Sequence, residues 1–322
     1  MKHEFTSGLA QQMEQFIEHK HSLGYKYDTG SYSLLSLDRF CTQKGYESKL
    51  TRELVETWII TREEKNSSPC RSWISPVREF GRYLQLTGDS EAYVVSDNFI
   101  IKSYRPIPYL FTENEIGSFF KACDTVVLGK SHQGRHLVIP VYFRFLYCSG
   151  VRTCEARLLK TEGVNLKEGY VDILRSKGLK DRRLYLPPDL ISLLCRYDKQ
   201  ISVYFPGREY FFPSTTGTCY SMGSIGRNFN LIWDSAELRT PSGKQPRAYD
   251  FRHHFAFANV NRWTDEGKNV NAMLPYLMRY MGHSSLESTY YYIHLVPEFF
   301  STYADKTRGL ENLLPEVDYG EE

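Results

Sequence analysis

The 322-residue chain has no apolar run that approaches the roughly 20 residues a membrane-spanning helix needs. Residues 1–10 lack a basic start followed by an apolar stretch, so we expect no secretory signal. No internal repeat is present either. Aromatic residues, by contrast, are not scarce, and at 15 % of the chain they exclude disorder throughout. The length indicates about two folded domains.

The cysteines lack a metal-binding or disulfide pattern. There are seven, an odd number, and no two form a Cys-x-x-Cys pair. No cluster of carboxylates has metal-ligand spacing either. The sequence thus predicts no metal, no cofactor and no disulfide framework, and the free thiols indicate a reducing, cytoplasmic compartment.

A large excess of one charge is also missing, because 40 basic and 38 acidic residues give a net charge of +2. This total hides an uneven distribution. Residues 1–110 hold 14 bases and 14 acids, residues 130–183 hold 12 bases and 5 acids, and residues 311–322 hold 5 acids and no base. A basic central region suits a polyanionic partner, and the acidic tail offsets it in the total.

Helically spaced apolar residues predict four helices at the start of the chain: near residues 7–23, after Gly30, after Thr51 and over residues 69–86. Thr51 is a suitable N-cap, and Pro69 suits a first helical position. The apolar period is then lost. We therefore predict a helical domain over residues 1–88 and a linker over residues 89–109.

The remaining residues, 110–322, are predicted to form a second domain. It begins with a capping box, in which Thr112 is the N-cap and Glu115 stands three residues later. Residues 164–166, 170–174 and 183–186 predict a small antiparallel sheet. Helical spacing predicts helices near residues 113–122, 137–148, 188–197, 222–236, 249–261, 270–281, 286–292 and 297–309. The expected fold class is mainly α with one small sheet.

Four short motifs of this second domain carry polar residues of the kinds that act on phosphates. Residues 148–155, Cys-Ser-Gly-Val-Arg-Thr-Cys-Glu, place Arg152 at a helix start and Glu155 on the same face three residues later. Lys177 lies in the turn between the second and third predicted strands. The other two motifs are Tyr-Asp-Phe-Arg-His-His at residues 249–254 and Met-Gly-His-Ser-Ser at residues 281–285, the latter followed by three tyrosines at residues 290–292.

Together and in this order, the motifs resemble those of the tyrosine recombinase, or phage integrase, family over about residues 112–296. The four-helix module resembles the family's core-binding domain. The resemblance implies a DNA-binding domain at residues 1–88 and a catalytic domain at residues 110–322 that ends in an interaction helix and tail. His283 and Tyr292 are nine residues apart, as the family's histidine and nucleophile are. The implied catalytic residues are Arg152, Lys177, Tyr249, Arg252, His283 and Tyr292.

The implied reaction explains these residue types. The phenol oxygen of Tyr292 would attack a DNA phosphodiester and form a 3′-phosphotyrosine. Arg152 and Arg252 would stabilise the extra negative charge of the transition state. Lys177 would protonate the departing 5′-oxygen, and His283 would hydrogen-bond the phosphate or help remove the phenol proton. General phosphate contacts are expected from four further bases of the same region: Arg175, Lys180, Arg182 and Arg183.

One position departs from the family pattern, because the family usually has histidine where this chain has Tyr249. A phenol can hydrogen-bond a phosphate oxygen, but it is neutral at pH 7. His253 and His254 stand at the wrong spacing to replace that histidine, and we expect them to be structural. Each motif alone has an ordinary explanation, such as a solvated ion pair between Arg152 and Glu155. The joint order and spacing carry the prediction.

Three alternatives stay open at this point. The chain could be a type IB topoisomerase-like enzyme that relaxes DNA, a DNA-binding protein of the same fold with impaired catalysis, or a helical scaffold with accidental motifs. Integration, inversion and resolution of replicon dimers use one chemistry. The departure at Tyr249 leads us to prefer a mobile-element or phage integrase. We expect no separate arm-binding domain before the four-helix module.

The resemblance also implies partners. These are double-stranded DNA recombination sites, a second copy of the chain in a dimer on each site, and a tetramer in synapsis. It further implies that the segment over residues 297–314 docks into a neighbouring subunit. Six apolar residues of this segment suit that role: Phe299, Phe300, Tyr303, Leu310, Leu313 and Leu314.

Overall fold

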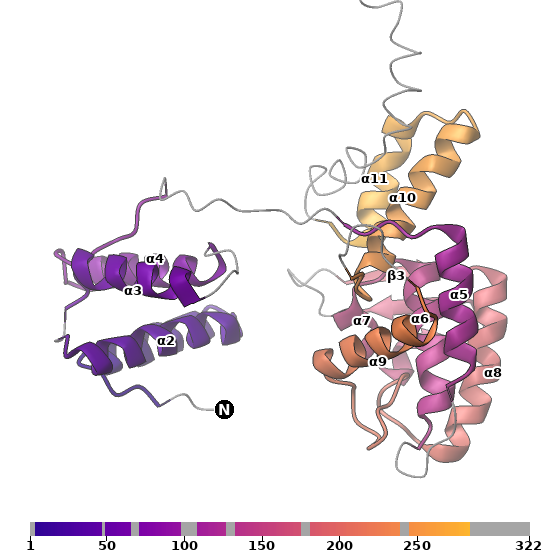
Figure 1. Ribbon diagram of the computed structural model, residues 1–322, viewed down its shortest axis with the longest axis horizontal. Coiled ribbons are helices and arrows are strands. Elements are labelled where there is room, and N and C mark those ends of the chain that lie inside the picture. Colours follow the sequence, from indigo (N-terminus) through magenta and orange to yellow (C-terminus); the bar gives the residue numbers. More distant parts are fainter. Residues whose placement is uncertain are drawn as a thin grey trace, which may run out of the picture. The chain divides into compact units, whose positions relative to one another are not determined.

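The computed structural model describes residues 4–46, 49–65, 71–97, 108–126, 133–174, 181–238 and 245–283. The chain divides into two compact units, Met1–Pro106 and Ile107–Glu322. Figure 1 shows the described part of the first unit as helices alone and that of the second as helices with a small sheet. No helix in the described ranges is both long enough and apolar enough to cross a membrane.

The described part of the first unit contains four helices: α1 (Ala10–Ser22), α2 (Asp28–Lys44), α3 (Arg52–Lys65) and α4 (Arg71–Leu86). Their apolar faces meet in one core that includes Phe16, Leu37, Trp58 and Phe80. Thr51 caps α3 as predicted, because its Oγ1 accepts a hydrogen bond from the Leu54 N–H at 3.2 Å. The predicted start of the fourth helix at Pro69 lies outside the described residues.

The second unit holds the other helices: α5 (Glu113–Asp124), α6 (Arg135–Ser149), α7 (Thr153–Arg157), α8 (Pro188–Tyr204), α9 (Met222–Ser235), α10 (Asp250–Asp265) and α11 (Val270–Met281). The predicted capping box starts α5: Glu115 N–H donates to Thr112 Oγ1 at 3.2 Å, and Thr112 N–H donates to Glu115 Oε2 at 2.8 Å.

Helix α6 is the centre of the second unit. Residues on every face of it are buried, and α5, α8 and α10 pack against it. Figure 1 shows α10 and α11 as a pair of helices at one end of the unit. The core around α6 is rich in aromatic rings, among them Phe119, Tyr142, Phe143, Phe229 and Phe251. This packing fixes the C-terminal end of α6, where the first arginine motif begins.

The sheet is antiparallel and has the order β1 (Val164–Asn165), β2 (Tyr170–Ile173), β3 (Arg182–Tyr185). Val171 of β2 pairs with Leu184 of β3, and both are buried. Strand β3 begins at Arg182, one residue earlier than the sequence indicated. Alternation along the strand places Arg182 and Leu184 on one face, opposite Arg183. The predicted fold class, mainly α with one small antiparallel sheet, is confirmed.

Candidate active site

Three polar side chains that are far apart in the sequence meet in the second unit. Arg152 directly precedes α7, Arg252 lies in the first turn of α10, and His283 follows α11. Arg252 Nη2 is 2.9 Å from His283 Nε2, and Arg152 Nη2 donates to the Gly282 carbonyl at 2.8 Å. The fold thus brings three of the six predicted catalytic residues to one place.

Gly150 makes the turn that positions the first arginine. It ends α6 in the left-handed region, with φ of +59°. A Cβ at this position would lie 2.3 Å from the ring of Phe255 in α10, so a larger residue would both strain the backbone and push α10 away. The turn sends the chain directly into α7, and the Gly150 carbonyl is left to accept a hydrogen bond from Arg252 Nη1 at 2.7 Å.

The Arg252 guanidinium joins the ends of three elements. Besides Gly150 it binds the Met281 carbonyl, through Nη2 at 2.7 Å, and His283. The residue is only 1 % exposed. A buried guanidinium is stable because its N–H groups meet carbonyl oxygens, so these contacts hold the end of α11 against the end of α6.

A carboxylate between two arginines forms the second part of the site. Glu155 Oε1 accepts from Arg152 Nη1 at 2.7 Å, and Oε2 accepts from the Arg152 backbone N–H at 2.9 Å. Arg182 of β3 binds both oxygens of the same carboxylate, at 3.0 and 2.7 Å. Burial alone would raise the Glu155 pKa, but the hydrogen bonds and charges of Arg182 and Arg152 outweigh it and lower that pKa to about 2. Glu155 is therefore ionised.

His283 is neutral in this arrangement. Burial, followed by the positive charges of Arg252 and Arg152, lowers its pKa to about 3. A guanidinium has no acceptor, so the 2.9 Å contact makes His283 Nε2 the acceptor and leaves the imidazole proton on Nδ1. The unprotonated imidazole adds no positive charge to the arginine pair.

Tyr249, the position that departs from the family pattern, directly precedes α10 and is 37 % exposed. Its ring meets the His253 ring edge-on, with 5.1 Å between the centroids. His253 is buried, and burial is the main reason that its pKa falls to about 4. His254 packs among aromatic rings, including those of Phe111 and Tyr147. These contacts fit the structural roles expected for the two histidines.

The two arginines of β3 differ from each other, although the sequence suggested one role for both. Arg183 faces outward, where it binds the Asp172 carboxylate at 2.8 and 2.9 Å and lies over the Tyr170 ring. Arg182 faces inward, and its side chain is only 8 % exposed. Arg182 is therefore not exposed for a general phosphate contact, because strand alternation turns its side chain toward Glu155. That alternation was the one sequence signal that could have separated the two arginines.

Several predicted site residues lie outside the described part of the chain. They are Arg175, Lys177, Lys180 and Tyr292, and the predicted helices at residues 286–292 and 297–309 lie there as well. Within the described ranges, no group of three or more His, Cys, Asp and Glu side chains is placed to hold a metal ion.

Comparison with known proteins gives one consistent result. The phage integrase family model matches residues 110–298. The integrase/recombinase y4rE of Sinorhizobium fredii (strain NBRC 101917 / NGR234) is 27 % identical over 292 residues, which cover 90 % of this chain and 92 % of that protein.

Solved structures share the fold. XerH site-specific recombinase, in a post-cleavage complex with a palindromic difH substrate, matches 91 % of this chain and 83 % of its own, with a TM-score of 0.65 and 18 % identity. A lambda integrase tetramer bound to a Holliday junction matches 87 % of this chain and 78 % of its own, with a TM-score of 0.58 and 14 % identity.

The family match covers more than half of the chain and includes all six predicted catalytic positions, so the chain belongs to the phage integrase family, the tyrosine recombinases. Enzymes of this class break and rejoin DNA strands at specific sites.

Proposed function

We propose that this recombinase cleaves DNA with Tyr292, holds one end as a 3′-phosphotyrosine, and rejoins that end to a second strand. The observation that carries the proposal is the meeting of Arg152, Arg252 and His283 at the ends of α6 and α11. The family match, which extends to residue 298, supports the same roles for Lys177 and Tyr292.

Each half of the proposed reaction exchanges one phosphoester for another. The phenol oxygen of Tyr292 bonds to phosphorus while the bond from phosphorus to the 5′-oxygen breaks. The phenol proton passes to His283 or water, and Lys177 gives a proton to the 5′-oxygen. A 5′-hydroxyl of the partner strand then attacks phosphorus and gives its proton to Lys177, and Tyr292 leaves and regains its own proton. Since one ester replaces another at each step, the reaction needs no ATP. The arginines and Lys177 would supply the positive charge and the proton, so the proposed steps use no metal ion.

The arginines stabilise the charge that builds up on the phosphorane-like transition state. Arg152 keeps 16 % of its side chain exposed and offers its remaining N–H groups to a non-bridging oxygen. Arg252 is buried, so it contacts the phosphate by exchanging its bond to Met281 or His283 for one to a phosphate oxygen. The bound anion would raise the low pKa of His283, which makes the imidazole a better proton acceptor when DNA is present.

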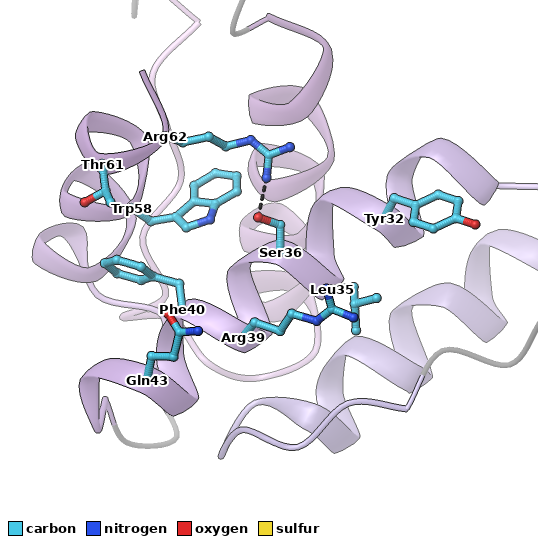
Figure 2. A pocket seen from close by; sticks show the side chains of 9 residues that line it. All are labelled: Tyr32, Leu35, Ser36, Arg39, Phe40, Gln43, Trp58, Thr61 and Arg62. Carbon is cyan, nitrogen blue, oxygen red and sulfur yellow. Dashed lines mark hydrogen bonds between the residues drawn. The ribbon is translucent and has the colours of Figure 1, made fainter. Parts of the chain in front are cut away.

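The first unit would also bind DNA. Its surface has a hollow of about 380 Å³ between α2 and α3, lined by residues that include Tyr32, Arg39, Trp58 and Arg62. Figure 2 shows the Arg62 guanidinium of α3 bound to Ser36 of α2, and Arg39 lies on α2 one turn after Ser36. Arg62 lies over the Trp58 ring, and Arg39 lines the same hollow, so the hollow offers two guanidinium groups that suit contact with a nucleic acid backbone.

In assembly, we propose a dimer on each DNA site and a tetramer that joins two sites. The lambda integrase structure, a tetramer bound to a Holliday junction, supports this proposal through its shared fold. Strand exchange requires a complex that joins two DNA sites, because the 5′-hydroxyl that releases Tyr292 comes from the other site.

The test is covalent trapping on DNA. The full chain is incubated with nicked duplexes that carry a randomised central region, and adducts that survive denaturation are isolated and sequenced. The nick makes the fragment that carries the new 5′-hydroxyl short enough to diffuse away, so it cannot reverse the reaction and the adduct accumulates. Wild type is expected to form adducts on a defined sequence, and Tyr292→Phe none. Tyr291→Phe, the neighbouring tyrosine, is the matched control and is expected to retain them.

Each other result contradicts a part of the proposal. Absence of any adduct with wild type would exclude covalent cleavage, and adducts with Tyr292→Phe would exclude this nucleophile. Adducts that reseal only to their own strand, never to a second duplex, would indicate a relaxing topoisomerase in place of a recombinase.

A further inference from the structure

Arg182 has a part in the site that neither its sequence motif nor a surface phosphate contact explains. Its guanidinium forms a fork with both oxygens of Glu155, and its Nε donates to the Tyr280 carbonyl at 2.8 Å. Glu155 and Arg182 are almost fully buried, with side chains 4 % and 8 % exposed. Burying a charged pair without matched hydrogen bonds would be costly, so these hydrogen bonds are what makes the buried position of the pair stable.

The Glu155 carboxylate has no acceptor site to spare. It receives four hydrogen bonds: from the Arg152 guanidinium, the Arg152 backbone N–H and two nitrogens of Arg182. A carboxylate offers about four lone-pair positions. All of them are used, so the orientation of Glu155, and through it that of Arg152, depends on Arg182.

Arg182 also holds the second partner of Arg152. Arg152 Nη2 donates to the Gly282 carbonyl, and Arg182 Nε donates to the Tyr280 carbonyl two residues earlier in the same turn. Gly282 has φ of +68°, and a Cβ there would lie 2.8 Å from Arg182 Nη1. The guanidinium therefore packs directly against the Gly282 backbone, and both groups that fix the Arg152 side chain are themselves fixed by Arg182.

The charges lead to the same conclusion. One carboxylate lies between two guanidinium groups, so Arg152, Glu155 and Arg182 together carry +1. Without Arg182 the carboxylate would cancel Arg152, and the site would lose positive charge where the transition state gains negative charge.

We infer that Arg182 is a positioning residue of the recombination reaction: it occupies Glu155 and the turn at Gly282, and thereby keeps Arg152 oriented and its charge available to the scissile phosphate. This inference rests on the proposed function. It assigns to Arg182 a task performed through Arg152, not contact with the DNA.

The test compares single-turnover cleavage by the full chain on the duplex selected by trapping and on the same duplex with a methylphosphonate at the scissile position. The methyl group removes one negative charge from the phosphate, so the loss of a stabilising cation should slow cleavage of the methylphosphonate duplex less than cleavage of the phosphate duplex. Arg182→Gln is expected to slow cleavage of the phosphate by about 100-fold and of the methylphosphonate by about 10-fold or less. Arg152→Gln should show the same pattern.

Two further variants separate positioning from folding and from direct contact. Arg208→Gln removes another buried arginine of the second unit, one that pairs with Asp198 and donates to the Phe211 carbonyl. This variant is expected to be less stable, so its burst amplitude, which measures the folded fraction, should fall. The cleavage rate constant of the folded fraction should stay unchanged. Glu155→Gln added to Arg182→Gln is expected to cleave no more slowly than Arg182→Gln alone, because no carboxylate is left to cancel Arg152.

The inference would be overturned by equal losses of Arg182→Gln on the two substrates, by a lower amplitude with an unchanged rate, or by multiplied losses in the double variant. Multiplied losses would indicate that Arg182 contacts the phosphate itself. If wild type forms no adduct at all, the proposed function fails. If wild type forms adducts and Arg182→Gln forms them at the same rate, only the inference about Arg182 fails.

Discussion

Two histidines beside the arginine pair are kept uncharged by their surroundings. His253 is 9 % exposed on α10, and its pKa falls to about 4 through burial, then through the charges of Arg247 and Arg252, with Asp250 opposing. His283 shifts in the same direction. The folded chain therefore binds fewer protons than the unfolded chain between these values and the ordinary pKa near 6.5.

The stability of the second unit should consequently fall as pH is lowered. Stability rises with pH wherever the unfolded state binds more protons, so the contribution of His253 is complete above pH 6.5 and is lost toward pH 4, by about 3 kcal/mol. Urea unfolding at pH 7, 6, 5 and 4 measures it. His253→Gln should have a flatter dependence than wild type, and the exposed His19→Gln should match wild type. Parallel curves for His253→Gln and wild type would contradict this.

At the level of single residues, the sequence was informative where a motif has a fixed spacing. Arg152 and Glu155 are three residues apart and form the predicted ion pair, with Arg152 as the extended N-cap of α7 and Glu155 in its first turn. Arg252 and His283 could be predicted only through the family resemblance, and their contact joins residues 31 apart. The link from Glu155 to Arg182 across 27 residues has no local signal, because it depends on how β3 packs against α7.

At the scale of elements, helix positions followed from apolar spacing and caps, and residues 270–281 were predicted with the bounds that α11 has. Helix α8 was predicted to end at residue 197 but continues to Tyr204, where Ile201 is buried in the core. Charged residues after Tyr197 obscured the period. Strand β3 begins one residue earlier than predicted, which brings Arg182 into the strand but leaves the alternation of inward and outward side chains unchanged.

Helix α2 provides the test of DNA binding by the first unit. Arg39 is exposed on this helix beside the hollow of Figure 2. If it contacts a phosphate, Arg39→Ala should weaken binding to all duplexes alike and reduce the slope of log K against log salt by about 1. Salt titrations on the selected duplex and on an unrelated one measure both effects.

The matched control is Arg52→Ala on α3, since this exposed arginine pairs with Glu56 four residues later. It should leave the slope unchanged. Equal slopes for Arg39→Ala and wild type would exclude a phosphate contact at Arg39, and equal losses for the two variants would indicate a general effect of charge.

At the scale of the whole molecule, the net charge of +2 averages over regions with different tasks. The bases gather over residues 130–183, which contain α6, α7, β1, β2 and the start of β3, whereas the last twelve residues hold only acids among their charged side chains. A total charge could not have indicated DNA. The distribution does, because the field near a bound phosphate is set by nearby groups.

The final prediction concerns assembly through the C-terminal segment. Its apolar residues, together with the family resemblance, led us to expect that it docks into a neighbouring subunit. Truncation after Ser301 removes Tyr303 and the three leucines, so it should abolish the complex of two DNA sites while adduct formation on one nicked site continues. Native gel shifts with two differently labelled duplexes measure this complex, and denaturing gels measure the adduct.

The control is truncation after Glu316, which removes only residues 317–322 and keeps all six apolar residues. It loses three of the tail's five acids. Synapsis should persist with this shorter deletion, because burial of apolar surface, not the acidic charge, would hold the subunits together. Synapsis that survives truncation after Ser301 unchanged would show that the segment does not dock, and loss of synapsis in both truncations would assign the contact to the acidic end.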